Sequence, residues 1–344
     1  MAKEGDAFSE VIKFERLHTI HLQSLTSLVC FYSGSDTLQL LSLKTVAVHG
    51  VFLPSNSIPY GSYVILGATD LVSLKLQNCT PPCAISSIIL ALLKSLKELE
   101  VRDSTIEVLF YMNDTEITKI ASQLRILTLK GLSKLTHVWE KKKNGVLMFP
   151  NLQQFQEIVE KEESTEAKFV LPCLERLILS FLPQVSCFYP QTFTLECPAL
   201  NIVSVLRCEG LELFQSEHSI GEGISVKRQP LISRLEDISN LRELKLDWKH
   251  ILALRSRLRS EKFTGVFKFV NKMSLLLDGD VSEMLKVVNE ILHRAPNLIE
   301  MVIHILNCKN SEIFFAQNPK IGEDGMLLQL RILTLFQVAA IRSI

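Results

Sequence analysis

The sequence has little that would mark a nucleic-acid binder or a secreted protein. Its 344 residues include 37 basic and 37 acidic ones, so the net charge is zero and no charged footprint for nucleic acid is present. The eight cysteines are scattered along the chain, and no paired cysteine caps stand at its ends. The first ten residues, MAKEGDAFSE, are charged and lack the apolar stretch of a secretory signal. These absences predict a reduced, cytoplasmic protein.

Long apolar runs are also missing. The longest, Ile85 to Leu93, is interrupted by Ser86 and Ser87. It falls far short of the roughly 18 to 20 residues that a membrane-spanning helix needs. We therefore expect no membrane span.

Catalytic and cofactor motifs are absent as well. The sequence contains no phosphate-binding loop, nucleophile elbow, His-Glu-x-x-His helix or kinase signature. His18 and His21 are three residues apart and would face opposite sides of a strand, so we expect no shared metal. Cys79 and Cys83 lack a second Cys or His pair at zinc-binding spacing. The sequence thus predicts no enzymatic activity, no cofactor and no metal.

What the chain does have is the pattern Leu-x-x-Leu-x-Leu, with aliphatic variants, repeated along its length. The first leucines of neighbouring units are mostly 25 to 28 residues apart. Ten good matches begin at Leu17, Leu43, Leu71, Leu96, Leu124, Leu174, Leu200, Leu241, Leu298 and Leu330, and a weaker one begins at Val270. A period of this length with this wording predicts a leucine-rich-repeat solenoid.

The expected fold is α/β: a curved horseshoe with a parallel β-sheet on its concave face and loops or short helices on its convex face. Because a repeat array grows by addition, we expect residues 1–344 to form a single solenoid of about 11 to 12 repeats.

Strand geometry assigns a role to each position of a repeat. Positions four and six lie on one face of the strand and enter the core, whereas positions three, five and seven point to the concave face. A ligand would be bound there, because those positions are free of packing constraints. Mixed charge and a tryptophan are typical of a protein-binding face. The candidate ligand-binding residues are Lys75, Gln77, Glu98, Glu100, Arg102, Asp103, Thr128, Lys130, Glu243, Lys245, Asp247 and Trp248.

Position nine often holds a short polar residue that satisfies backbone groups where the chain leaves the strand. Cys79 and Cys208 stand at that position in their repeats, and Ser104 occupies it in the repeat of Leu96. We expect the two thiols to be buried in the core as small hydrophobic groups, without metal binding or catalysis.

Several segments interrupt the rhythm. The step from Leu152 to Leu174 is short, whereas residues 208–240 include the Gly-rich, charged stretch GEGISVKRQP, which predicts an exposed loop. The acidic run from Glu157 to Glu166 and the lysines at 141–143 are typical of solvated loops, although either could recruit a partner. Apolar residues recur at helical spacing over 280–294, which predicts a convex-side helix.

The end at Ile344 lacks a polar cap, which would favour self-association.

Several phrases are similar to one family of repeat proteins. They are LKELEVRDSTIEVLF at 96–110, LRILTLKGLSKLTHVW at 124–139, FPNLQQ at 149–154, EIVEKEE at 157–163, PCLERLILSFLPQVSCFYP at 172–190 and PNLIEMVI at 296–303. With them the chain resembles the C-terminal repeat region of plant coiled-coil nucleotide-binding leucine-rich-repeat disease resistance proteins. FPNLQQ and EIVEKEE stand closer together than in that family, which suggests lost sequence between them.

The resemblance implies a recognition role in plant defence. Such a repeat region senses a pathogen effector or a host protein altered by one, and it restrains a nucleotide-binding switch. The family's signalling and nucleotide-binding domains are not in this sequence, so we expect a fragment, a truncated product or a decoy. An alternative is a substrate adaptor of a ubiquitin ligase, which would need an F-box of about 40 residues. Only some sixteen residues precede Leu17.

Overall fold

The computed structural model describes thirteen stretches of the chain, and the structural statements below concern those residues. They are residues 11–24, 37–50, 70–79, 95–111, 123–140, 167–186, 188, 193–213, 240–258, 269–278, 281–295, 297–306 and 331–338. The chain divides into two compact units. The first comprises Met1–Leu127 and Gly131–Thr165, and the second comprises Thr128–Lys130 and Glu166–Ile344.

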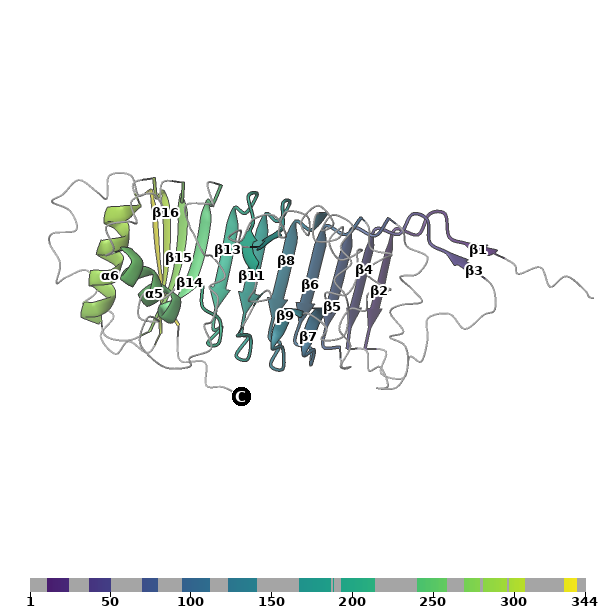
Figure 1. Ribbon diagram of the computed structural model, residues 1–344, viewed down its shortest axis with the longest axis horizontal. Coiled ribbons are helices and arrows are strands. Elements are labelled where there is room, and N and C mark those ends of the chain that lie inside the picture. Colours follow the sequence, from purple (N-terminus) through teal and green to yellow (C-terminus); the bar gives the residue numbers. More distant parts are fainter. Residues whose placement is uncertain are drawn as a thin grey trace, which may run out of the picture. The chain divides into compact units, whose positions relative to one another are not determined.

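The first unit is built on a parallel sheet with the strand order β2-β4-β5-β6 (Figure 1). These strands are β2 (Thr19–Gln23), β4 (Thr45–His49), β5 (Ser73–Gln77) and β6 (Glu98–Arg102). Each strand pairs with the next at equivalent repeat positions, so that Leu74 lies beside Leu99 in register. Strand β8 (Ile126–Lys130) has residues in both units.

The second unit continues the same pattern in the order β11-β13-β14-β15-β16-β17 (Figure 1). Its strands are β11 (Arg176–Ser180), β13 (Ile202–Leu206), β14 (Glu243–Asp247), β15 (Lys272–Asp278), β16 (Glu300–Leu306) and β17 (Ile332–Val338). The pairings β11–β13, β13–β14, β14–β15, β15–β16 and β16–β17 are all parallel.

Every Leu-x-x-Leu-x-Leu motif, including the weak one at Val270, therefore forms a strand. The alternation within each motif explains the core. In β6, Leu99 and Val101 are fully buried, while the residues that alternate with them, Glu98, Glu100 and Arg102, are half-buried on the opposite face. Val270, Met273 and Leu275 are fully buried too, so the weak match fills its core positions as well as the others do. The prediction of a leucine-rich-repeat solenoid with a parallel sheet is confirmed.

The strands formed by the Leu-x-x-Leu-x-Leu motifs belong to one sheet, which we call the main sheet. Other, short strands lie outside it, and the sequence did not predict them. They make three two-stranded parallel sheets: β1 (Val11–Lys13) with β3 (Thr37–Gln39), β7 (Val108–Tyr111) with β9 (His137–Glu140), and β10 (Ala167–Val170) with β12 (Phe193–Glu196). Between β7 and β9 the rings of Phe110 and Trp139 stack with centroids 4.1 Å apart. Both side chains are buried, so these strands extend the core beyond the main sheet.

Two helices lie in the second unit. Helix α6 (Val281–Arg294) confirms the helix predicted over 280–294, and its buried face includes Met284, Val287 and Ile291. Helix α5 (Trp248–Leu258) directly follows β14 and was not predicted. Its buried residues Ile251 and Leu254 are three apart, as expected for the core-facing side of a helix.

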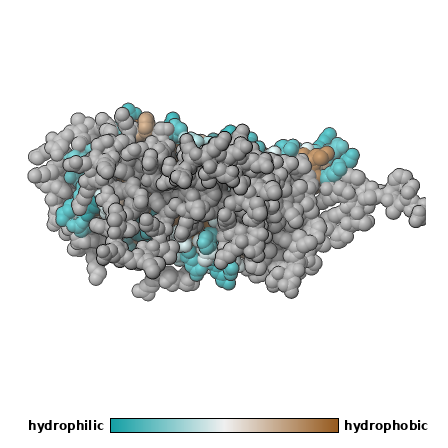
Figure 2. Space-filling view, in the orientation of Figure 1, coloured by the Kyte–Doolittle hydropathy of each residue, from teal (hydrophilic) through white to brown (hydrophobic). Residues whose placement is uncertain are grey.

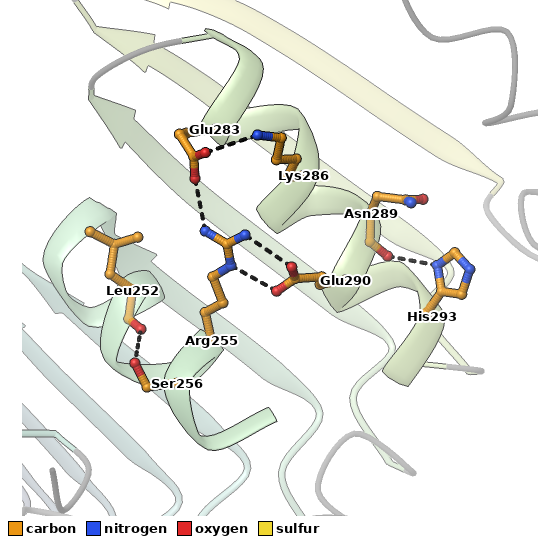
Figure 3. Close-up of polar contacts among 8 residues, drawn as sticks. All are labelled: Leu252, Arg255, Ser256, Glu283, Lys286, Asn289, Glu290 and His293. Atoms are coloured by element: carbon orange, nitrogen blue, oxygen red, sulfur yellow. Dashed lines mark hydrogen bonds and ion pairs between the residues drawn. The ribbon is translucent and has the colours of Figure 1, made fainter. Parts of the chain in front are cut away.

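Arg255 joins these two helices (Figure 3). Its Nε and Nη2 donate to the two oxygens of Glu290 at 2.8 and 2.9 Å, and its Nη1 donates to Glu283 at 2.9 Å. Lys286 Nζ lies 3.0 Å from Glu283 on the same helix. The two carboxylates raise the pKa of the Arg255 guanidinium above its ordinary value. A guanidinium held by two carboxylates fixes α5 against α6 in one orientation.

In the repeats from β2 to β13, position eight is the residue directly after the strand, and it adopts a left-handed backbone conformation. The residues concerned are Ser24, Gly50, Asn78, Asp103, Gly131, Phe181 and Arg207, with φ between 48° and 66°. The N–H groups of Ser24, Gly50, Asn78 and Phe181 donate to the last carbonyl of the next strand, as in Gly50 to Gln77 at 2.9 Å. The N–H of Arg207 donates to the side chain of Asp247 instead. In the repeat of Leu241 the same position is Trp248, where α5 begins instead. In the last three repeats it lies within the longer strands β15, β16 and β17.

A substitution at Gly131 would test whether the left-handed conformation is needed in this turn. Its φ is +66°, and a Cβ added there would overlap the carboxylate of Asp103. We expect Gly131→Ala to lower the free energy of unfolding by about 1–2 kcal/mol, because an L-residue is disfavoured in this conformation. The overlap adds to this cost unless Asp103 rotates away. Urea denaturation of Gly131→Ala and of the double variant with Asp103→Ala would separate the two effects. Equal midpoints for wild type and Gly131→Ala would contradict the prediction.

Position nine behaves as predicted. The Ser104 hydroxyl donates to the Arg102 carbonyl at 2.8 Å and accepts from the Cys79 N–H at 3.1 Å. The thiols of Cys79 and Cys208 lie 3.5 and 3.4 Å from the carbonyls two residues before them, and both residues are buried. Burial raises the pKa of the Cys208 thiol to about 12, so it stays protonated and packs as a small apolar group.

Some predicted features lie outside the described residues: the irregular segment after Leu152, the loop GEGISVKRQP, both charged runs and the end of the chain. Within the described residues, no helix is long and apolar enough to cross a membrane. Exposed apolar side chains include Phe14 and Leu41, which follow β1 and β3, and Figure 2 shows a small apolar spot at that end of the first unit.

Candidate ligand-binding surface

The face of the main sheet opposite the core, which we call the open face, carries positions three, five and seven of each repeat. On β6 these are Glu98, Glu100 and Arg102, all half-buried. Ser73, Lys75 and Gln77 lie beside them in register on β5. The structure thus places five predicted site residues on one continuous surface of the first unit.

These side chains form a network of ion pairs. Lys75 Nζ lies 3.2 Å from Glu98 Oε1 and 3.5 Å from Glu100 Oε2. Arg102 Nε contacts the other oxygen of Glu100. Ser73 Oγ donates to Glu98 Oε2 at 2.7 Å, which fixes that carboxylate from its second side. Each charged side chain is therefore held by a residue of the same or the neighbouring strand.

The network raises the pKa of Lys75 and lowers the pKa of Glu98, so both values move further from neutral pH. Burial alone would lower the pKa of Lys75, but the hydrogen bonds and charges of Glu98 and Glu100 outweigh it, so the net shift is upward. Burial would likewise raise the pKa of Glu98, but Ser73 and Lys75 outweigh it and the net shift is downward. Both groups stay charged at neutral pH.

A hollow of about 190 Å³ lies over β2, β4, β5 and β6 on this face. Its polar lining comes from positions five and seven of four successive repeats: His21, Gln23, His49, Lys75, Gln77, Glu100 and Arg102, with Ala47 between them. His49 Nε2 is also 3.0 Å from Asn78 Nδ2, which orients that ring. A hollow of this volume has room for side chains of a partner.

Four of these residues, His21, Gln23, Ala47 and His49, were not among the predicted site residues. The signal was present, because they occupy positions five and seven of the first two repeats. The sequence also shows that the small residue Ala47 stands between longer ones, but not that the surrounding side chains leave this space open. The candidate surface therefore extends from β5 and β6 to β2 and β4.

Asp103 lies at the edge of this surface. It stands at position eight, in the turn with φ 48°, and its side chain is exposed. Gln77 Nε2 donates to Asp103 Oδ2 at 3.4 Å. Asp103 thus borders the open face without lining the hollow.

On β8 the two predicted residues differ. Lys130 is exposed, as expected for position seven. Thr128 is only 8% exposed, which corrects its assignment to a ligand-binding surface. Its short side chain lies between the longer ones of Ile126 and Lys130 on the same face of the strand, so little of it can reach a partner.

In the second unit, Glu243 and Lys245 lie half-buried on the open face of β14. Lys272 and Glu300 form an ion pair at 3.1 Å on that face. His304 belongs to it as well, and burial together with the nearby charge of Lys245 lowers its pKa. These residues form a second polar surface, described here only within its own unit.

Asp247 and Trp248 correct the sequence-based assignment. Asp247 is 9% exposed, and its carboxylate accepts from the backbone N–H groups of His250, at 3.2 Å, and of Arg207. It caps the first turn of α5, and its Oδ1 is 2.6 Å from His250 Nδ1. Trp248 is the first residue of that helix and is half-buried, not an exposed side chain on a strand. Strand alternation predicted that the Asp247 side chain points to the open face, but it caps the helix instead.

The described residues include no cluster of three or more His, Cys, Asp or Glu side chains that could hold a metal ion. No disulfide joins the described cysteines Cys79, Cys173, Cys197 and Cys208.

Comparison with known families places the first unit's surface in context. Residues 54–159 match the family model described as plant disease resistance protein RPS2-like, leucine-rich repeats. This confirms the resemblance that the sequence phrases predicted. The match covers about a third of the chain and includes β5 and β6, which carry Lys75, Glu100 and Arg102. Over this span the chain is similar to a resistance-related repeat module. The sequence matches no curated protein.

Proposed function

We propose that this chain is a protein-recognition module of plant defence, and that the open face of its first unit binds a pathogen effector or a host protein altered by one. The observation that carries the proposal is the hollow over β2, β4, β5 and β6. It lies on the face where a repeat array presents variable side chains, and β5 and β6 fall within the span similar to disease resistance repeats.

The character of the surface supports binding over catalysis. A general acid or base works best with a pKa near the operating pH. On this surface the pKa of Lys75 is raised and that of Glu98 is lowered, so each group is further from that condition than it would be in water. Ion-paired, half-buried side chains of this kind provide fixed donors and acceptors for a partner.

Filling the hollow tests the proposal. Proximity labelling in leaf tissue would compare the wild-type chain with Ala47→Trp, which places a large ring among His21, His49 and Lys75. We expect partners of the wild-type chain to be labelled at least about tenfold less by the variant, since a blocked contact worth about 1.4 kcal/mol has that effect.

Two controls keep the comparison specific. Lys97→Gln changes an exposed residue outside the hollow in the same unit, and Lys245→Ala changes the open face of the second unit. Both should label the same partners as the wild type. If Ala47→Trp folds normally, by circular dichroism, and keeps every partner, the first unit's open face is not the binding surface.

A further inference from the structure

The charges around the hollow are not equally accessible. The side chains of Lys75 and Arg102 are 43% and 41% exposed, whereas those of Glu98 and Glu100 are 29% and 15% exposed. The two carboxylates are therefore less accessible to solvent than the two cations with which they pair. A partner that approaches the open face therefore meets an ammonium and a guanidinium first.

Both cations keep hydrogen-bonding capacity for a partner. An ammonium has three donors, and the two carboxylates face Lys75 from two directions. Arg102 contacts Glu100 through Nε, and within the described residues no partner is recorded for its two terminal NH₂ groups. Those terminal groups form the fork that binds a carboxylate in a bidentate manner.

Among the charged residues that line the hollow, Lys75 and Arg102 are positive and Glu100 is negative. Glu98 lies beside the lining and pairs with Lys75, so the charges of the network balance, and its two cations are the more exposed members. His21 and His49 line the opposite side, and either ring can donate a hydrogen bond. Gln23 and Gln77 add amide groups that can pair with a peptide backbone.

We propose that the hollow is a subsite for an acidic residue of the bound protein, whose Asp or Glu carboxylate is held between Lys75 and Arg102. This inference rests on the proposed function and names the chemistry of the partner at that surface. Because Glu98 and Glu100 already hold the cations in place, little side-chain entropy is lost when the acid binds. The amides of Gln23 and Gln77 favour an acid carried on a peptide over a free anion.

A peptide selection tests this without a known partner. Random dodecapeptides displayed on phage would be selected on the full chain, with Ala47→Trp used to discard peptides that bind elsewhere. We expect Asp or Glu to be enriched at one position of the remaining peptides. Fluorescence anisotropy of one such peptide should show binding about tenfold weaker with Arg102→Gln or Lys75→Gln. Lys97→Gln should leave binding unchanged.

Two further measurements separate an acid-binding subsite from general binding. Replacing the peptide's acid by its amide should weaken binding to the wild type about tenfold, but much less to Arg102→Gln, because the two changes remove the same interaction. Glu100→Gln should leave binding of the acidic peptide as tight as in the wild type or tighter, since it removes a negative charge from the lining. A basic ligand would show the opposite sign.

The outcomes distinguish the two proposals. Peptides that Ala47→Trp excludes but that show no acid enrichment, or that need a basic or phosphorylated residue, overturn the acidic subsite and leave the binding surface intact. If Ala47→Trp excludes no peptide, the surface itself is wrong, and the subsite fails with it. Circular dichroism of every variant must match that of the wild type.

Discussion

Replacing Gly210 with alanine is expected to lower the free energy of unfolding by about 3 kcal/mol, the upper part of the range for overpacked sites. A Cβ at this position would lie 2.6 Å from the backbone oxygen of Val185 and 3.1 Å from its carbonyl carbon. Val185 is itself fully buried in the turn that follows β11. Unlike a flexible side chain, a backbone carbonyl cannot rotate away, so one turn must move away from the other.

Chemical denaturation followed by circular dichroism would measure the effect. Glu209→Ala, one residue earlier, is the matched control: its side chain is exposed, and we expect a change within about 0.5 kcal/mol. A Gly210→Ala variant as stable as the wild type would mean that the two turns are not packed as closely as described.

Removing the carboxylate of Asp247 is expected to have an effect of similar size. Asp247→Asn should cost about 2–3 kcal/mol, the range for hydrogen bonds to a charged group, because it removes the charged acceptor of the His250 and Arg207 N–H groups. His250 is 1% exposed, and its other ring nitrogen lies 3.2 Å from the Leu211 carbonyl. The carboxylate also accepts from the Arg207 N–H, so the substitution weakens the join between α5 and β13.

The same pair predicts a pH dependence. Burial alone would raise the pKa of Asp247, but the hydrogen bonds and charge of His250, with the Arg207 N–H, lower it below its ordinary value of 3.8. A lowered pKa in the folded state means that the carboxylate contributes stability above its ordinary pKa. This contribution is lost as the pH falls through the lower, folded-state pKa.

Denaturation of wild type and Asp247→Asn at several pH values would measure this. The difference in stability between them should be constant from pH 7 to about pH 5 and should shrink below about pH 4. Asp70→Asn, which removes an exposed ion pair with Lys44, should change stability by less than about 1 kcal/mol throughout. A difference that grows towards acid pH would refute the assigned role of Asp247.

The sequence predicted the strands well because one rule decides them. A residue at position four or six must enter the core, and no local alternative competes. The rule failed at Asp247, where position seven also precedes a helix, and a carboxylate there can cap the helix. Ile251 and Leu254, with the capping Asp247, were the available signals for α5. They were missed because the helix follows the strand without a linker.

The candidate surface was predictable in its members but not in its shape. Equivalent positions of neighbouring repeats pair in register, so the contact of Lys75 with Glu98 and Glu100 follows from the repeat alignment. The depth of the hollow does not, because it depends on how the longer side chains around Ala47 are oriented. The unequal exposure of the cations and the carboxylates depends on rotamers, which only the packed structure defines.

The left-handed residue at position eight has a consequence for how such a chain changes over time. In the repeats from β2 to β13 it follows the last residue of the strand, and in four of them its N–H donates to the next repeat, as that of Ser24 does to His49. In these repeats the end of the strand is therefore set locally, independent of how long the following connection is. Connections lengthen or shorten without moving the strands that flank them.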